Sequence, residues 1–182
     1  MIRGNRRFGR AGQTFGFTVV KAPSEFAAAD HWWRAEFAAK CAQVALPLVR
    51  DAWPDCPHET EKAMNRSVEL ALDAARNQLV PPELSKLSLA CRICAGAVLR
   101  PFFPNAPRMD EPLPPTPENC RVVHLIANSV ANASESVESG ESAAWFAFQG
   151  YGFAIEAAEA TRNFEAYKRL QGLRVEYFPN YG

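Results

Sequence analysis

Half of the prolines in this chain are concentrated in one short segment. Seven of the 14 lie between Pro101 and Pro117, in the run PFFPNAPRMDEPLPPTP. Proline has no amide hydrogen and fixes its own φ, so a segment this rich in proline continues neither a helix nor a central strand. We therefore expect residues 101–117 to form an extended strap with polyproline II character. The strap joins two halves of the chain that both carry helical periodicity.

Five long helices are predicted from apolar spacing and from capping signals. The first has Ser24 as its expected N-cap and runs from Glu25 to Arg50 through an alanine-rich segment, with a kink or an end at Pro47. The other four are expected over residues 58–79, 82–100, 117–137 and 143–170. The fourth helix has Thr116 as its N-cap and Pro117 at its first helical position. These segments predict a mainly α-helical fold, orthogonal or bundle-like.

The fifth predicted helix is apolar on every side over residues 143–155, which is typical of a helix at the centre of a fold. Gly150 and Gly152 lie in this stretch, and each costs about 1 kcal/mol relative to alanine inside a helix. A close crossing of another helix or a local break would explain them, and we expect a close crossing at both. Residues 156–170 become amphipathic, with Phe164 among the side chains expected to face inward.

The first 22 residues are expected to form a basic arm, because residues 1–21 carry four arginines and one lysine and no acid. Period-2 alternation over residues 13–20 predicts a short edge strand, and the tail 173–178 is its expected partner, so a short β element would join the termini. The chain has no net charge, and residues 122–161 carry five glutamates and no lysine or arginine. A neutral chain with such an acidic segment is a poor nucleic-acid binder. Nucleic acid is therefore not an expected partner.

Composition places the chain in the ordinary globular class. With 182 residues, 48% hydrophobic and 22% charged, it is expected to form a single helical domain over residues 23–182. The longest mostly apolar run, residues 142–155, is too short to span a bilayer, so no membrane partner is expected. The cysteines are odd in number and lie mostly in helical patterns, which favours reduced thiols and a cytoplasmic location. They are Cys41, Cys56, Cys91, Cys94 and Cys120.

One group of residues has the spacing of a metal site. Cys91 and Cys94 share a face of the third helix, and Cys120 and His124 share a face of the fourth, so antiparallel packing could present four ligands to a tetrahedral zinc. Both cysteines of the third helix also belong to its apolar stripe, where a thiol packs as a small hydrophobe. We therefore predict buried, reduced, metal-free cysteines and keep zinc as a hypothesis.

No motif for catalysis is present. The sequence has no G-x-S-x-G, Walker loop, G-x-G-x-x-G, H-E-x-x-H or Glu-x-x-His. His58 and the acids near it are explained by capping and by the helix dipole at the start of the second helix. We therefore predict no catalytic residues, no cofactor and a protein that is not an enzyme.

Three segments resemble the opening helices of a family of bacterial immunity proteins encoded beside polymorphic toxins. They are residues 41–48 (CAQVALPL), residues 53–55 (WPD) and Lys62-Ala63, which opens an alanine-rich helix. The likeness covers roughly a quarter of the chain and ends after Gln78, where Pro81-Pro82 and the strap replace the Ala/His-rich helices of the family. The resemblance implies a small helical protein that neutralises or holds another protein, and it transfers no functional residues.

The predicted function is non-enzymatic protein binding, in immunity or in complex assembly, with another protein or a second copy of the chain as the partner. The competing class is a small-molecule-binding or metal-binding helical protein, or an enzyme whose site the sequence does not reveal. Gene neighbourhood separates the two. A neighbouring toxin gene favours protein binding, whereas a metabolic operon favours the second class.

Overall fold

The described part of the chain is mainly helical. The computed structural model describes residues 21–103, 105, 107–108, 112–138, 140 and 142–180. Within these ranges there are eight helices and no strand: α1 Ser24–Ala28, α2 His31–Ala45, α3 Leu48–Ala52, α4 His58–Asn77, α5 Leu84–Ala97, α6 Pro117–Glu135, α7 Ala143–Ala160 and α8 Phe164–Tyr177. The mainly α-helical prediction is confirmed. Over the same residues, no helix combines the length and the apolar character needed to cross a membrane.

The first predicted helix is divided into α1, α2 and α3. The Asp30 carboxylate accepts hydrogen bonds from the backbone amides of Trp32 and Trp33, so a new helix begins at His31 instead of continuing α1. α2 ends before Pro47, which precedes the short helix α3. The break at Pro47 was expected, but the break at Asp30 was not. The structure has eight helices in its described residues where five were expected, and the Asp30 cap accounts for one of the additional helix starts.

The fifth predicted helix is also divided. α7 ends at Ala160, Arg162 takes a left-handed φ of 53°, and the side chain of Asn163 accepts a hydrogen bond from the amide of Ala166 to start α8. Phe164 is therefore the first residue of a new helix and is 76% exposed. Its expected inward position is wrong because the stripe of α7 does not continue through the turn.

The expected β element is not formed by the C-terminal tail. Residues 173–177 belong to α8, and residues 13–20 lie outside the described residues, as does nearly all of the basic arm. The tail is instead anchored by aromatic packing, because Phe178 stacks on Phe26 of α1 with ring centroids 4.0 Å apart. The surrounding aromatic cluster includes Phe37, Phe148, Tyr151 and Tyr177. Burial of these rings, rather than strand pairing, holds the end of α8 against α1 and α2.

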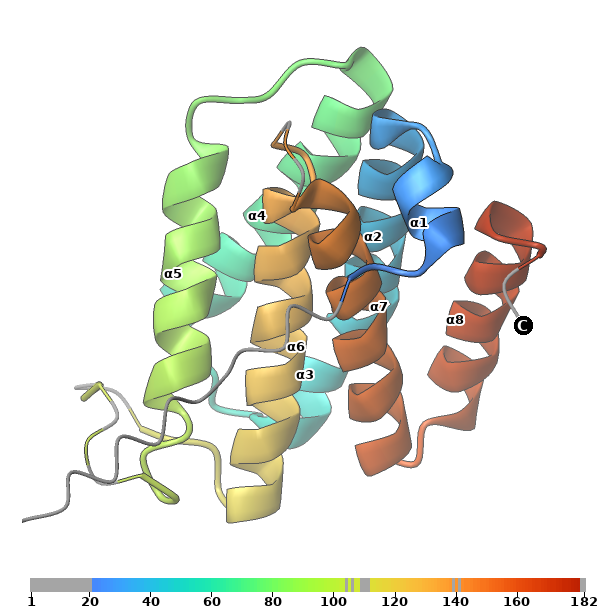
Figure 1. Cartoon of the computed structure of the whole chain (residues 1–182). Helices are drawn as coiled ribbons and strands as arrows, with labels where there is room; N and C mark the ends of the chain where they lie inside the picture. Colours follow the sequence, from blue (N-terminus) through green and yellow to red (C-terminus); the bar gives the residue numbers. More distant parts are fainter. Residues whose placement is uncertain are drawn as a thin grey trace, which may run out of the picture.

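The helix at the centre of the bundle is α6. Figure 1 shows α5, α6, α7 and α8 side by side, with α2 and α4 behind them, and α6 contacts α2, α3, α4, α5 and α7. Ten consecutive residues of α6, from Leu125 to Ser134, are buried. A helix buried over this length has neighbours on every side. The expectation that residues 143–170 would form the central helix is therefore wrong, since α7 keeps partly exposed residues such as Phe146 and Phe153.

Only one of the two glycines of α7 lies at a tight crossing. A Cβ atom added to Gly150 would lie 3.3 Å from Asn132 Cβ and 3.5 Å from the carbonyl oxygen of Ser129, both in α6. A Cβ atom added to Gly152 would have no neighbour within 4 Å. The predicted close crossing is confirmed at Gly150 and is wrong at Gly152, which is only half-buried.

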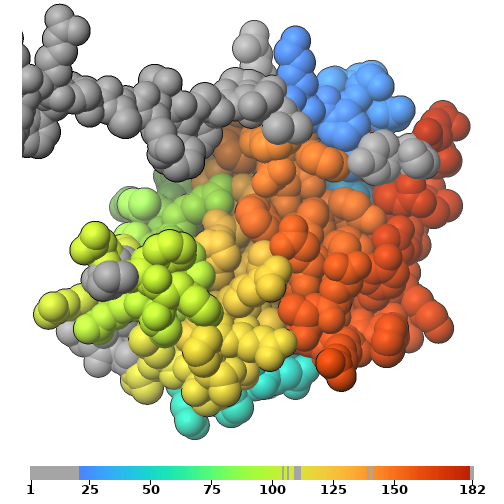
Figure 2. All heavy atoms as spheres, turned by 60° about the horizontal axis from the view of Figure 1, so that its bottom comes forward, coloured from blue at the N-terminus to red at the C-terminus, as the bar shows by residue number. Residues whose placement is uncertain are grey.

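The proline-rich strap ends as the sequence predicted. Its described residues before Pro117 include turns and bends but no helix or strand. Thr116 Oγ1 accepts a hydrogen bond from the amide of Asn119 at 3.1 Å, and Pro117 is the first residue of α6. Pro107 lies next to Gly96, so the strap returns against α5 before it reaches α6. Figure 2 shows the strap, in yellow-green, protruding beside the start of α6.

Candidate functional site

The central helix carries a row of buried polar side chains. They are Asn128, Ser129, Asn132 and Ser134, each at most 7% exposed. Buried polar groups cost stability unless they are hydrogen-bonded. Ser134 Oγ lies 2.7 Å from Ser67 Oγ in α4, and Ser129 Oγ donates to the carbonyl oxygen of Gly150 in α7 at 2.8 Å. The two asparagines are hydrogen-bonded to α5.

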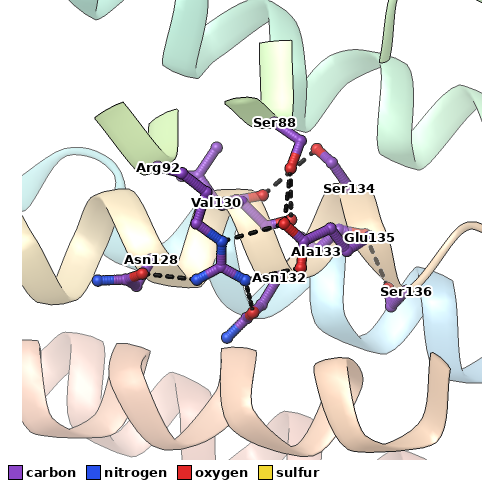
Figure 3. A network of polar contacts seen from close by, with 10 residues as sticks. Ser88, Arg92, Asn128, Val130, Asn132, Ala133, Ser134, Glu135 and Ser136 are labelled. Carbon is purple, nitrogen blue, oxygen red and sulfur yellow. Dashed lines mark hydrogen bonds and ion pairs between the residues drawn. The ribbon is translucent and has the colours of Figure 1, made fainter. Parts of the chain in front are cut away.

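Arg92 of α5 is the centre of this network (Figure 3). Its guanidinium donates to both carboxylate oxygens of Glu135, from Nε at 3.0 Å and from Nη2 at 2.7 Å. Nη1 donates to Asn128 Oδ1 at 2.6 Å, and Nη2 also donates to Asn132 Oδ1. Ser88 Oγ adds a third bond to Glu135 at 3.0 Å. A bidentate, charge-assisted pair with these additional bonds fixes α5 against α6.

His124 extends the network toward the start of α6. Its Nδ1 lies 2.8 Å from the carbonyl oxygen of Ala95, so Nδ1 carries a proton and donates. Its Nε2 lies 3.2 Å from Asn128 Nδ2, which is placed to donate to it. We call the whole set the α5–α6 polar seam, and it comprises Ser88, Arg92, His124, Asn128, Asn132 and Glu135.

The polar groups of the α5–α6 polar seam are hydrogen-bonded to one another, so their role in this structure is to hold α5 against α6. Four of the five N–H groups of Arg92 are already used by α6, and the Glu135 carboxylate accepts from two side chains. The side chains of Arg92 and Glu135 are only 32% and 22% exposed. Sequence reasoning did not find this set. The one feature of the sequence that pointed to it was Arg92, a charged residue next to the apolar stripe of α5.

Three of the four residues of the zinc hypothesis interact with other residues of the fold. Cys91 contacts Ser67 of α4, whereas Cys120 Sγ donates to the carbonyl oxygen of Pro114 at 3.8 Å. His124 is used by the α5–α6 polar seam. Among the residues that the structure describes, no three His, Cys, Asp or Glu side chains are grouped so that they could hold a metal ion. These positions give zinc no support, and it stays a hypothesis.

The predicted burial of the cysteines is confirmed. Cys91, Cys94 and Cys120 are 1%, 6% and 0% exposed, and none of the five cysteines, all of which are described, is in a disulfide. Burial raises the pKa of Cys91 to about 12 and the pKa of Cys41 well above its usual value. Because the thiolate is the reactive form, these thiols are expected to be inert in the folded protein.

Thiol labelling tests this arrangement. At about pH 8 a thiol with a pKa near 12 is ionised on the order of one part in ten thousand, so Ellman's reagent is expected to label only the half-buried Cys56 quickly. Unfolding in urea should release the remaining four thiols. The variant Cys56→Ser is the control and should remove the fast phase. Two or more fast thiols in the native protein would contradict the burial described above.

Pockets on the described surface include one that is apolar, one that contains an ion pair and a third of about 370 Å³ lined by Asp51, Ala52, Glu118, Asn119, Val122, Ala160, Thr161 and Arg162. One apolar pocket of about 230 Å³ lies at the turn between α7 and α8 and is lined by Ala158, Glu159, Arg162, Asn163, Phe164 and Tyr167. Sites for drug-sized ligands usually span roughly 300–1,000 Å³. A second pocket, near Pro47, contains Arg50 and Glu61, whose side chains pair with each other at 2.6 Å. Small-molecule binding therefore has modest geometric support.

The outward side of α5 exposes large apolar residues. Leu89 and Ile93 are one turn apart on the side of α5 that faces away from the bundle, and they are 60% and 55% exposed. Further apolar side chains are exposed just before and just after α5. Together they form a set that we call the α5 face: Leu79, Val80, Leu89, Ile93, Phe102 and Phe103, which are six of the nine exposed large hydrophobic residues in the described ranges.

Part of the α5 face was placed wrongly by sequence reasoning. Leu79 continues, at helical spacing, the apolar stripe of Met64, Val68, Ala71 and Ala75 in the second predicted helix, which predicts an inward position, but it is 71% exposed. Gln78 takes a left-handed φ of 55° and ends α4 at Asn77, so the helical register does not reach Leu79. Leu89 and Ile93 lie outside the apolar stripe that the sequence predicts for this helix, which consists of Leu84, Leu87, Cys91, Cys94 and Val98. Their position off this stripe was a signal for surface exposure.

Comparisons with known proteins give no further identification. Protein-family models, curated proteins and solved structures all gave no match to this chain. The resemblance of residues 41–63 to immunity proteins receives no support from these comparisons. Function is therefore inferred from the α5 face and the α5–α6 polar seam.

Proposed function

We propose that this protein is a non-enzymatic protein-binding module that docks through the α5 face. The observation that carries this proposal is the concentration of exposed apolar side chains along one helix and its two ends, with exposures of 43–71%. Isolated exposed apolar residues are ordinary, but a group of them marks an interaction site. Covering these side chains with a partner would supply the hydrophobic free energy of binding.

The α5–α6 polar seam supports the same proposal. Arg92 and Ser88 fix the inner side of α5 to α6, while Leu89 and Ile93 lie on its outer side. A helix that is rigidly held before binding loses less conformational entropy when a partner docks. The seam therefore preorganises the surface that binds.

An immunity protein, which neutralises a toxin by binding it, would be one instance of this function. The resemblance of residues 41–48, 53–55 and 62–63 to that family supports this reading. A toxin gene adjacent to the gene for this chain would support it further. A second candidate, binding of a small apolar ligand, is favoured by the pocket beside Phe164 and Tyr167 at the turn between α7 and α8.

Site-specific photocrosslinking tests the proposed docking surface. A photoreactive phenylalanine analogue is placed at Leu89, at Ile93 or at Val175, and each full-length variant is irradiated in cells of the organism that encodes it. Val175 of α8 is the matched control, because it is as exposed as Ile93, at 55%. We expect a protein adduct of discrete mass from positions 89 and 93 and none from position 175. The absence of adducts from positions 89 and 93, or equal adducts from all three, would contradict the proposal.

A further inference from the structure

We infer that two neighbouring pockets at the end of α7 form one binding site for an aromatic α-amino acid. The first is the apolar pocket of about 230 Å³ at the turn between α7 and α8. The second, of about 370 Å³, is lined by residues of α3, of the start of α6 and of the end of α7. Arg162 lines both pockets. The inference rests on the second candidate function, small-ligand binding at this turn, and is independent of the α5 face.

The larger pocket lies where three helix termini meet. α3 ends at Ala52, α6 begins at Pro117 and α7 ends at Ala160. Figure 2 turns this end of the bundle forward and shows α3 in cyan beside the start of α6 in yellow and the end of α7 in orange. The side chain of Asn119 donates to the carbonyl oxygen of Ala52 at 2.6 Å and so holds α6 against α3. Part of the pocket wall is therefore fixed before a ligand binds.

The apolar pocket has the size and the walls of a site for an aromatic ring. Phe164 and Tyr167 both line it and are three positions apart in the first turns of α8, so they share a face of that helix. A cavity of roughly 150 Å³ is enough to hold benzene. Phe164 is 76% exposed, which leaves its ring accessible to a ligand. Contact between aromatic rings is favourable beyond the area that it buries.

The charges of the larger pocket favour an ammonium group. Asp51 and Glu118 both line it, and neither carboxylate has a hydrogen bond or ion pair with the residues that the structure describes. Ala160 and Thr161 also line it, at the C-terminus of the 18-residue helix α7, which carries a partial negative charge. The N-terminus of α6 has the opposite sign, but its charge of about half a unit is smaller than that of the two carboxylates.

Arg162 supplies a group that binds a carboxylate. Its side chain is exposed, and its guanidinium has no partner among the described residues. A guanidinium can hold a carboxylate through two parallel hydrogen bonds. In an aromatic amino acid the ring, the ammonium and the carboxylate branch from adjacent carbon atoms. One small molecule can therefore address the apolar pocket, the two acids and Arg162 together.

The backbone at Arg162 supports a role for its side chain. Arg162 has a left-handed φ of 53°, a conformation that glycine or asparagine adopts more readily than arginine. The turn is held by the bond from the Arg162 amide to the Glu159 carbonyl oxygen at 2.9 Å and by the Asn163 cap of α8. Backbone strain of this kind is concentrated at functional sites. An arginine at this position costs stability that its side chain does not regain within the described residues.

A ligand series tests each of the three contacts separately. The isotope-labelled full chain is titrated with L-phenylalanine up to about 20 mM and followed by NMR chemical shifts, and we expect a dissociation constant on the order of 0.1–1 mM. Phenethylamine lacks the carboxylate, phenylacetate lacks the ammonium and L-alanine lacks the ring. Each should bind about tenfold more weakly than L-phenylalanine. Equal binding of phenethylamine or of phenylacetate would overturn the inference.

Variants of the charged residues assign the contacts. Arg162→Asn removes the guanidinium but suits the left-handed φ, so the fold should be kept. It should weaken L-phenylalanine about tenfold and leave phenethylamine unchanged. Asp51→Asn/Glu118→Gln should weaken L-phenylalanine and phenethylamine but not phenylacetate. Arg76→Gln, in the last turn of α4 and outside both pockets, is the control and should change nothing. Equal effects of Arg162→Asn and Arg76→Gln would contradict the assignment, and circular dichroism checks that each variant is folded.

The inference and the candidate function on which it rests fail in different ways. Benzyl alcohol has the ring and no charge. If it binds as tightly as L-phenylalanine and is insensitive to Arg162→Asn, the amino-acid class is overturned and apolar-ligand binding at this pocket stands. The absence of shifts with every probe overturns both. Protein binding through the α5 face is decided separately, by the photocrosslinks from positions 89 and 93.

Discussion

Replacement of Arg92 by leucine is expected to lower the free energy of unfolding by about 2–4 kcal/mol. The change removes the cation that pairs with Glu135 and leaves the amide oxygens of Asn128 and Asn132 without their donor. Loss of one partner of a fully buried pair costs about 3–5 kcal/mol, and the lower figure reflects the partial exposure of both side chains. Urea unfolding followed by circular dichroism measures the change.

Arg66 provides the matched control for this experiment. It also pairs with carboxylates, those of Glu69 and Glu83, but its side chain is 50% exposed. Exposed ion pairs contribute about 0–1 kcal/mol, so Arg66→Leu should have a small effect. The double variant Arg92→Leu/Glu135→Leu should recover part of the lost stability, because no unpaired charge remains. Equal losses for Arg92→Leu and Arg66→Leu would show that the α5–α6 polar seam does not stabilise the fold.

Local signals in the sequence predicted the parts of the fold that depend on neighbouring residues. Thr116 and Pro117 start α6 because capping and a fixed φ act within one helical turn. The strap is free of helix and strand in its described residues because proline removes amide hydrogens wherever it occurs. The break at Asp30 depends on equally local chemistry, and an aspartate before two tryptophan amides was a usable signal.

The position of α6 at the centre could not be predicted in this way. Periodicity identified its apolar face, and its asparagines and serines would ordinarily be assigned to a surface exposed to solvent. Their burial depends on Arg92, which is 36 positions from Asn128 and 43 from Glu135 in the sequence. Only the packing of α5 against α6 brings these groups together. The candidate site was missed for the same reason, because its central residue gains its role from a distant helix.

Replacement of Gly150 by leucine is expected to destabilise the protein by about 1–3 kcal/mol or more. Even a Cβ atom at this position lies 3.3 Å from Asn132 Cβ, and the rest of a leucine side chain would have to enter the contact between α6 and α7. Asn132 cannot move away freely, because its side chain is bonded to Arg92. The better helix propensity of leucine, about 1 kcal/mol relative to glycine, offsets only part of this cost.

Substitution of Gly152, two residues further along α7, is expected to change stability in the opposite direction. Gly152 is half-buried, and an added Cβ atom meets nothing within 4 Å, so Gly152→Ala should stabilise the protein by about 0.5–1 kcal/mol through helix propensity alone. The midpoint of urea unfolding should therefore fall for Gly150→Leu and rise for Gly152→Ala. A midpoint that does not fall for Gly150→Leu would mean that α6 and α7 do not cross closely at Gly150. The hydrogen bond from Ser129 of α6 to the Gly150 carbonyl of α7 also requires that the two helices lie close together at this point.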